Sequence, residues 1–230
     1  MKYLVLAVLL AGCDASIDPP WQLDHDRIIA VRATPPRIVA GAQSEIDTLV
    51  GRKGARPTPE VPPGAQVVSP QSLATALRFE ANRWIVTAPD EARLAAVRTE
   101  LGLAPGAPVP LVVGVGFPET AFSSGLHDEP VAAIKTVWLG EAAENPTLVT
   151  DPAETPELVV APLTNVPLFV EVGEGDDVNW LTSCGTMHDF DLPESYLRVE
   201  LEDPMVGDLA VVVRTELGGV AWRVWSIRAE

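Results

Sequence analysis

The chain of 230 residues has few cysteines, few histidines and few basic residues. Two cysteines and three histidines are too few for a disulfide scaffold or for a zinc framework, because each needs about four or more such side chains. Lys and Arg number 16 against 32 Asp and Glu, which gives a formal net charge of −16. A surface of that sign repels phosphate backbones. We therefore expect no nucleic-acid partner and no metal site.

Long hydrophobic runs are also absent from the sequence. The longest apolar run near the N-terminus, Tyr3 to Leu10, is roughly half the ~18 residues that a transmembrane helix needs. It follows Met1-Lys2 and is followed by the small residues Ala11 and Gly12 directly before Cys13. A basic start, an apolar stretch and a small-residue cleavage site are the three parts of a signal peptide, in that order. The sequence predicts a signal peptide over residues 1–12.

The four residues at the predicted cleavage site carry a resemblance of their own. Leu10, Ala11, Gly12 and Cys13 resemble the lipobox of bacterial lipoproteins. The resemblance implies a diacylglyceryl group on the Cys13 sulfur, cleavage between Gly12 and Cys13, and acylation of the new N-terminus. Two or three acyl chains anchor a protein durably, whereas a single chain holds it only marginally.

The resemblance also implies a cellular location. We expect a lipid-anchored protein in the cell envelope of a Gram-negative bacterium, facing the periplasm or the cell surface. Asp14 follows the anchor cysteine, which in enteric bacteria would imply retention at the inner membrane. Sorting rules differ between bacterial groups, so both membranes stay open.

The segment 13–26 is acidic and contains prolines, including Asp18-Pro19-Pro20-Trp21 and Asp24-His25-Asp26. Prolines extend a chain and carboxylates keep it solvated. The composition predicts a tether between the anchor and the folded body.

Residues 27–140 are expected to form a β-rich block with one helix. The strand signals are apolar or alternating runs bounded by proline and glycine, and they lie at 27–33, 44–50, 84–86, 109–117 and 131–139. An amphipathic helix is predicted at about 89–101, because a capping sequence precedes it, Leu94, Val97 and Leu101 share one face, and Gly102 follows. Residues 51–64 are rich in Gly, Pro and basic side chains and are expected to form a long exposed loop.

Residues 141–156 are polar and contain prolines, and we expect them to form a linker, or a long loop within one sandwich. Short strand signals then recur over residues 157–230 at the spacing of a β-sandwich. The final pair, 207–214 and 221–229, is predicted to form a hairpin across Gly218-Gly219. The fold class expected for the whole chain is mainly β.

Both ends of the body resemble a known kind of protein. Asp18-Pro19-Pro20-Trp21 with the strand at 27–33 near the start, and Val211-Val212-Val213-Arg214 with Gly218-Gly219-Val220-Ala221-Trp222 near the end, resemble uncharacterised Gram-negative lipoproteins with immunoglobulin-like domains. The ending is similar to the last hairpin of PKD-type modules. The resemblance implies an immunoglobulin-like β-sandwich, and the family has no assigned activity to carry over.

Several short motifs contain residue types that occur in cofactor, catalytic or metal sites. Gly114-Val115-Gly116 follows a predicted strand but lacks the third glycine and the helix of a dinucleotide site. Ser123 to Asp128 holds a hydroxyl, an imidazole and a carboxylate outside the strand-turn-helix setting of a hydrolase. Cys184, Met187 and His188 include the ligand types of a copper site, but a buried core cysteine is the commoner outcome. We expect no catalytic residues and no cofactor.

Acidic residues gather in two presumed turns, at Glu171 to Asp177 and at Asp189 to Glu194. Carboxylates converging from loops can bind Ca²⁺, although the spacing matches no EF-hand. Solvated turns are the commoner reading of such clusters.

The sequence therefore predicts a non-enzymatic cell-envelope interaction or structural module, whose partner would be an unknown envelope protein or glycan. Two alternatives stay open. One is an envelope enzyme or enzyme accessory factor with its site in the loops 51–64 and 118–130, and the other is a calcium-dependent adhesin-like module.

Overall fold

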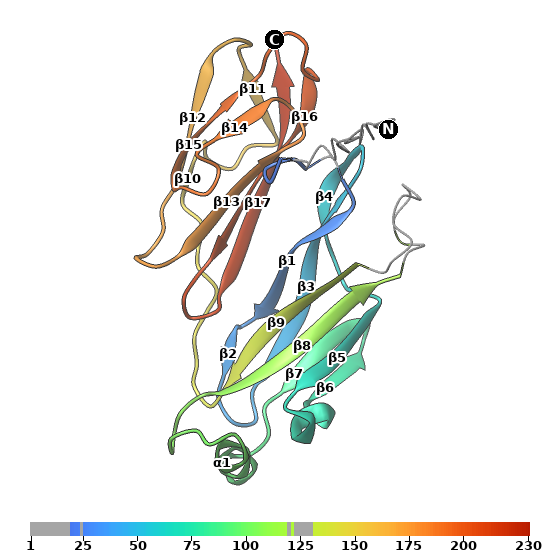
Figure 1. Cartoon of the computed structure of the whole chain (residues 1–230), viewed down its shortest axis with the longest axis vertical. Coiled ribbons are helices and arrows are strands. Elements are labelled where there is room, and N and C mark those ends of the chain that lie inside the picture. Colours follow the sequence, from blue (N-terminus) through green and yellow to red (C-terminus); the bar gives the residue numbers. More distant parts are fainter. Residues whose placement is uncertain (1–18, 24, 119–120, 122–130) are drawn as a thin grey trace, which may run out of the picture.

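The computed structural model describes residues 19–23, 25–118, 121 and 131–230. Strands from residues 27–139 and from residues 150–229 form separate sheets, and the two groups lie one after the other along the long axis of the molecule (Figure 1). Each group of sheets encloses its own hydrophobic cluster. The mainly-β fold class predicted from the sequence is confirmed.

The first sandwich has two sheets. The strand order in one sheet is β1-β3-β7-β6, with β4 also paired to β3, and in the other it is β2-β9-β8-β5. The strands of the first sheet are β1 (Arg27–Thr34), β3 (Gln43–Arg52), β4 (Ala55–Glu60), β6 (Leu77–Glu80) and β7 (Arg83–Thr87). The strands of the second sheet are β2 (Arg37–Ile38), β5 (Gly64–Ser69), β8 (Val109–Phe117) and β9 (Val131–Leu139).

The second sandwich repeats this plan. One sheet has the order β10-β12-β15-β14 and the other the order β11-β17-β16-β13. The strands of the first of these sheets are β10 (Thr150–Asp151), β12 (Asn165–Val170), β14 (Thr186–His188) and β15 (Glu194–Arg198). The strands of the other are β11 (Glu157–Val160), β13 (Asp177–Thr182), β16 (Val206–Arg214) and β17 (Val220–Ala229).

The strand order in both sandwiches is immunoglobulin-like. In each, the opening stretch of chain is split between the sheets: β1 and β10 start one sheet, and β2 and β11 cross to the other, where they pair in parallel with β9 and β17. With β1 or β10, four strands follow the ABED order, to which the first sandwich adds β4, and three more strands complete the CFG-type sheet, as in immunoglobulin domains. Trp180 is fully buried on β13, the strand that corresponds to C, and stacks on Trp225 at 6.2 Å between ring centroids.

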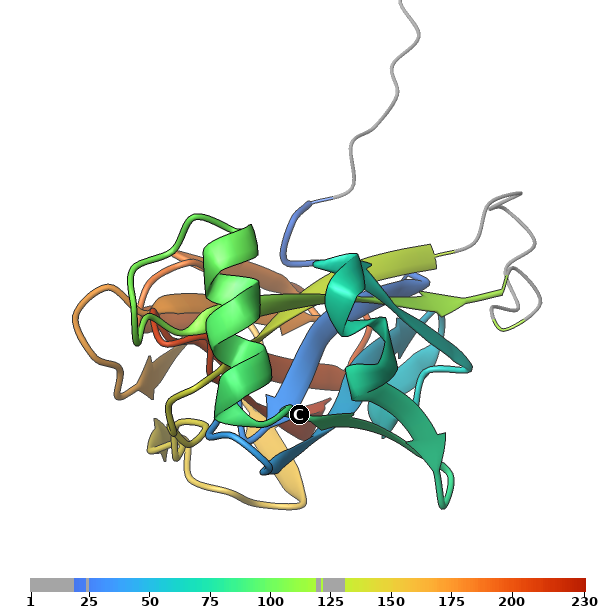
Figure 2. The same ribbon diagram turned by 90° about the horizontal axis from the view of Figure 1, so that it is seen from below.

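The predicted helix is present as α1 (Glu91–Glu100), inserted between β7 and β8. The side chain of Asp90 accepts a hydrogen bond from the Arg93 backbone N–H, which caps the helix, and Leu94 and Val97 are buried. A second, short 3-10 helix, η1 (Gln71–Ala76), joins β5 to β6. Both helices lie across the end of the first sandwich that is remote from the second (Figure 2).

The structure corrects the prediction of a long exposed loop at residues 51–64. Ala55–Glu60 forms β4 and pairs with β3, and β5 begins at Gly64. Pro57 and Pro59 made this stretch resemble a loop, but β4 pairs with one neighbour only, and proline is tolerated on such an edge strand.

The stretch predicted as linker, 141–156, also contains structure. Thr150 and Asp151 form β10 and pair with β12. Asn145 forms hydrogen bonds with both sandwiches: its side-chain N–H donates to the Ala33 carbonyl, and its side-chain oxygen accepts from the Val220 N–H. The chain between the sandwiches is therefore fixed to both of them.

The free edge of the second sheet of the first sandwich is formed by β5. Its pairing with β8 changes register between Val67 and Ser69, which marks a β-bulge. The strand is followed at once by Pro70 and η1.

Candidate functional site

The two sandwiches meet in a contact region that is buried and apolar. A hydrophobic cluster fills it, with members from the first sandwich and its N-terminal approach and members from the second. The first group is Leu23, Ile29, Ala30 and Leu49, and the second is Leu181, Ala210, Val212 and Val220, with Trp222 and Val224 packed at the margin. We call this set the junction cluster.

The junction cluster explains an unusual burial pattern on β16. Leu209, Val211 and Val213 point into the core of the second sandwich. Ala210 and Val212 point the other way and are also fully buried, because the first sandwich covers that face. A strand with both faces buried reads as a continuous apolar run, which is what the sequence shows at 209–213.

Hydrogen bonds to backbone carbonyls surround the junction cluster. Arg214 donates to the Ile29 carbonyl at 2.9 Å, and Arg37 donates to the Leu217 carbonyl at 2.7 Å. Arg56, on β4, donates to the Val224 carbonyl and to the Ser226 hydroxyl. Arg32 lies 3.9 Å above the Trp222 ring while its guanidinium pairs with Asp47. An apolar centre with a polar rim fixes the relative orientation of two domains.

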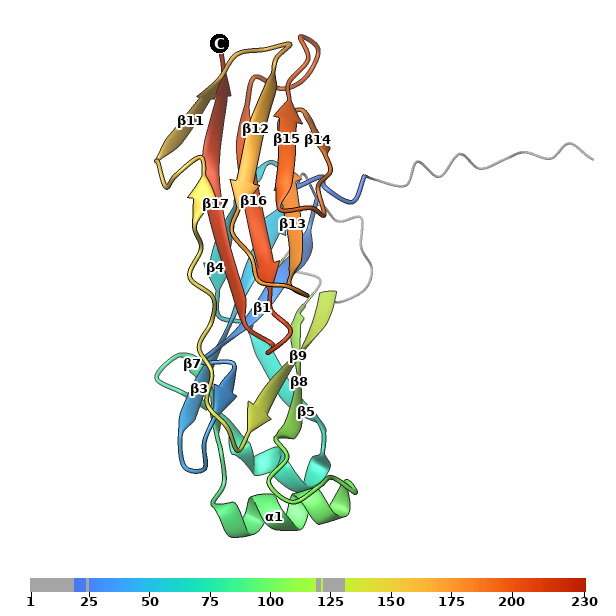
Figure 3. The ribbon, with the colours of Figure 1, turned by 90° about the vertical axis from the view of Figure 1, so that its left-hand side faces the viewer.

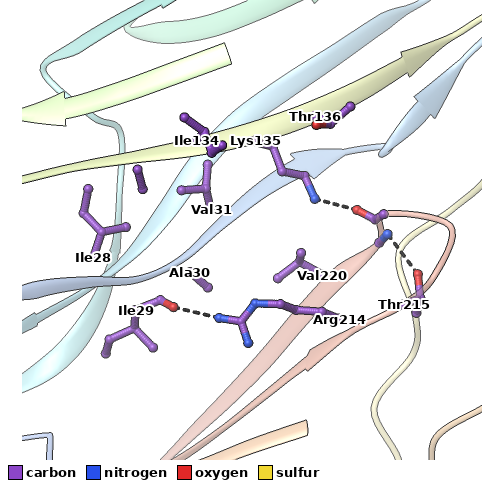
Figure 4. Close-up of a pocket in the computed structure, with 13 residues that line it drawn as sticks. Ile28, Ile29, Ala30, Val31, Ile134, Lys135, Thr136, Arg214, Thr215 and Val220 are labelled. Atoms are coloured by element: carbon purple, nitrogen blue, oxygen red, sulfur yellow. Dashed lines mark hydrogen bonds between the residues drawn. The ribbon is translucent and has the colours of Figure 1, made fainter. Parts of the chain in front are cut away.

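A cavity of about 380 Å³ opens beside the junction cluster, with walls from both sandwiches (Figure 4). From β1 come residues 28–31, from β9 residues 133–136, and from the second sandwich Arg214 and the turn that leads into β17. Two of the lining side chains are cations. Lys135 is 8% exposed and donates to the Gly218 carbonyl, and Arg214 donates to Ile29 and to Asn179 Oδ1.

Burial shifts the proton affinity of both cations. Removal from water, with a smaller contribution from the neighbouring Arg214 charge, lowers the pKa of Lys135 to about 8. Burial likewise lowers the pKa of Arg214, although the Asp177 carboxylate acts against this effect. The two cations therefore destabilise each other across the cavity.

Residues predicted as tether are partly docked on the second sandwich. Gln22 forms a parallel β-bridge with Thr182 of β13, and Leu23 and Trp21 exchange backbone hydrogen bonds with the same residue. The Trp21 ring packs against Phe190 at 5.7 Å. Asp26 is buried and accepts a hydrogen bond from the Lys53 N–H. The prediction of a solvated tether over 13–26 is wrong for this described part.

The lipobox residues Leu10, Ala11, Gly12 and Cys13 lie outside the described residues, as do Ser123 to Asp128. The predicted lipidation and cleavage at Cys13 therefore stay predictions. Within the described ranges, no helix has the length and hydrophobicity that crossing a bilayer requires.

Cys184 is a buried side chain of the second core. It is fully inaccessible, and its thiol donates to the Pro204 carbonyl at 2.7 Å. Burial, with a smaller contribution from Asp203, raises the pKa of the thiol to about 11. Met187 is buried in the same core, whereas the His188 ring stacks on Tyr196 at 4.4 Å. These three side chains serve packing.

The two acidic turns flank different strands of the second sandwich. In the first, Asp176 caps the turn by accepting a hydrogen bond from the Gly173 N–H. In the second, Asp189 adopts a positive φ of 54°. Over residues 19–23, 25–118, 121 and 131–230, no three His, Cys, Asp or Glu side chains gather closely enough to hold a metal ion.

Comparison with solved structures returned tandem β-sandwich modules. The fibronectin(III)-like modules of Clostridium thermocellum CbhA are 12% identical over 87% of this chain and 94% of theirs, with a TM-score of 0.31. The tandem Ig repeats of Dlar are 11% identical over 90% and 98%, with a TM-score of 0.30. The titin domains z1z2, in a complex with telethonin, are 12% identical over 86% and 93%, with a TM-score of 0.29.

Neither the protein-family models nor the curated proteins gave a match to this sequence. The immunoglobulin-like assignment rests on the strand order and on the parallel pairing of β2 and β11.

The sequence reasoning missed the junction cluster, yet two signals of it were present. Leu49 was the one apolar residue on the otherwise charged face of its strand, with Glu45 and Asp47. In the structure, the Glu45 end of that face of β3 is accessible to solvent, whereas Leu49 is fully buried in the junction cluster. This burial explains the apolar residue among charged ones. The apolar run at 209–213 was the second signal.

Proposed function

We propose that this chain is a lipid-anchored, non-enzymatic protein of the Gram-negative cell envelope, and that it works as one rigid body presenting its surfaces to an envelope protein or glycan. The N-terminal lipobox sequence supports the anchor. The junction cluster with its polar rim supports the rigid body, and this is the observation that carries the proposal. Relative motion of two domains is restricted where their interface is hydrophobic, and the centre of this interface is apolar.

The docked N-terminal segment supports a short attachment. Pro19, the first described residue, lies six positions after Cys13, with five residues between them. A fully extended chain of that length spans at most about 20 Å. With the lipid in the bilayer, the body would be held within that distance of the membrane surface.

The place of this attachment supports a side-on arrangement. Residues 19–23 lie against β13, between the end of the molecule formed by α1 and the end that carries the C-terminus (Figure 3). A tether fixed at that place would hold the long axis alongside the membrane and leave both ends accessible to a partner. The rigid junction would then keep the two ends at a constant separation.

The anchor is tested by intact mass and detergent partitioning of the chain expressed in a Gram-negative host. We expect a protein cleaved before Cys13, carrying added acyl mass and partitioning with detergent. Cys13→Ala should lose both the acyl mass and the partitioning.

The chain offers a matched control in its other cysteine. Cys184→Ala removes a buried thiol and should keep the acyl mass and the partitioning. A wild-type protein that is unmodified, still carries Met1 and stays in the aqueous phase would overturn the proposal.

A further inference from the structure

Two cationic side chains line the cavity at the junction of this otherwise acidic protein. Lys135 comes from β9 of the first sandwich and Arg214 from β16 of the second, and both line the same cavity (Figure 4). The whole chain carries a net charge of −16, so a buried Lys135 and a half-buried Arg214 without an ion pair need a reason.

Neutral acceptors surround both cations. Lys135 donates a hydrogen bond to the Gly218 carbonyl, and Arg214 donates to the Ile29 carbonyl and to the Asn179 amide oxygen. Among the described residues, no carboxylate lies within 4.0 Å of either side chain. Asp177 acts on Arg214 only at longer range. Buried cations are normally paired with an anion, because leaving them unpaired is costly.

Both cations have N–H groups that these hydrogen bonds do not use. An ammonium has three N–H groups and a guanidinium has five, whereas Lys135 uses one and Arg214 uses two in the bonds above. A carboxylate can accept from both side chains through its two oxygens, and charge-assisted bonds of this kind are the strong ones. An anion bound there would also remove the repulsion between the cations.

Apolar side chains form much of the remaining cavity wall, beside Thr136, Thr215 and the glycines of the turn. Ile28, Val31 and Ala133 line it from the first sandwich, and Val220 lines it from the second. Ile134 also lines it and is 71% exposed, so the cavity reaches the surface at that residue. A wall of this composition favours a ligand with an apolar body, and a fully hydrated inorganic anion would gain little from it.

We propose that the cavity binds a small organic anion, a carboxylate with an apolar body, whose charged end lies between Lys135 and Arg214. Such a carboxylate occurs in a free fatty acid and at the C-terminus of a peptide with apolar residues. Binding would add a link between the sandwiches, because each contributes one of the two cations.

The proposal is tested by calorimetric titration of the full chain carrying Cys13→Ala, so that neither lipid nor detergent competes for the cavity. At pH 6.5 and low salt we expect saturable, one-to-one binding of octanoate. Octanol supplies the apolar body without the charge, and inorganic phosphate supplies the charge without the apolar body, so both should bind at least about tenfold more weakly. An N-acetylated tripeptide ending in leucine, compared with its amide, tests the peptide source.

Variants locate the site. Lys135→Met removes the charge at similar length and should weaken octanoate binding at least about tenfold, whereas Lys135→Arg should retain it. Ile134→Asp changes an exposed rim residue, leaves the fold intact and should also weaken binding. Arg83→Gln removes an exposed cation of the first sandwich that pairs with Glu45 and should leave binding unchanged.

Three results would overturn the proposal. They are an absence of saturable binding by both octanoate and the tripeptide, equal binding of octanoate and octanol, and unchanged octanoate affinity in Lys135→Met and Ile134→Asp. If the tripeptide binds and octanoate does not, the proposal stands and the source is a peptide C-terminus.

Discussion

Leu49 offers the sharpest test of whether the two sandwiches form one rigid body. Its side chain is fully buried, although the neighbouring residues on the same face of β3 are charged. Its neighbours in the junction cluster include Val212 of the second sandwich. The change Leu49→Ala should lower the free energy of unfolding by about 2–5 kcal/mol, the usual cost of such a truncation at a buried site.

Truncation of a buried side chain in any core would lower stability by a similar amount, so a second substitution is needed to test the junction cluster. Val212→Ala should cost about 2–3 kcal/mol, from lost transfer free energy and a small cavity. If both side chains pack in one cluster, the double variant should depart from additivity by about 1 kcal/mol. Urea unfolding at 25 °C, followed by tryptophan fluorescence and by circular dichroism, measures each free energy.

Ile46 supplies the matched control. It lies three residues before Leu49 on β3 and is equally buried, but it belongs to the core inside the first sandwich. Ile46→Ala should destabilise by a similar amount and add with Val212→Ala to within about 0.5 kcal/mol. If the Leu49 and Val212 pair is as additive as this control pair, or if the wild type unfolds in two separate transitions, the reasoning about the junction is refuted.

Three further predictions concern single side chains. The pKa of Lys135 is lowered to about 8 in the folded chain from an ordinary 10.5, so the unfolded chain binds more protons between these two pH values. The free energy of unfolding should therefore rise from about pH 8 to 10.5, by on the order of 3 kcal/mol. Lys135→Met should lack this rise in urea titrations, and a pH profile identical to the wild type would contradict the assignment. Cys184, whose pKa is raised to about 11 by burial, should resist alkylation in the folded chain and react once urea unfolds it, and prompt native-state labelling would contradict its burial. Trp21→Ala removes the contact with Phe190 and should speed proteolytic cleavage near residues 19–26 while lowering stability by only about 0.5–1.5 kcal/mol; unchanged cleavage would show that this segment is not held by its aromatic anchor.

The strands with strong periodic patterns were predicted closely. The strands expected at 109–117 and 131–139 match β8 and β9, and the helix at about 89–101 matches α1 with its cap. Every second residue of β8 is buried, β9 follows the same alternation from Lys135 onward, and α1 buries Leu94 and Val97 on one face. The spacing of apolar residues in these segments therefore indicates the secondary structure directly.

Elements with little burial were missed. β4 contains two prolines and is mostly exposed, and β2 and β10 have two residues each. Their pairing is decided by partners distant in the chain, such as Trp138 opposite Arg37, and no local pattern carries that information.

The junction cavity was not predicted, for a related reason. Cys13 was predicted from a local motif, because signal-peptide processing reads contiguous residues, and it lies outside the described residues. The junction cavity unites Lys135 with Arg214, which are far apart in the sequence. Lys135 stands as one charge within an apolar strand, and nothing near it in sequence indicates a second cation opposite.

The edge formed by β5 has a consequence for molecules crowded together. An unpaired strand edge is a template for a strand from another copy, and regular flat edges are the ones that lead to aggregation. The bulge between Val67 and Ser69 disturbs the regular spacing of donors and acceptors along β5, and the proline and turn that follow end the strand early. A neighbouring copy would therefore find no continuous ladder to extend along β5.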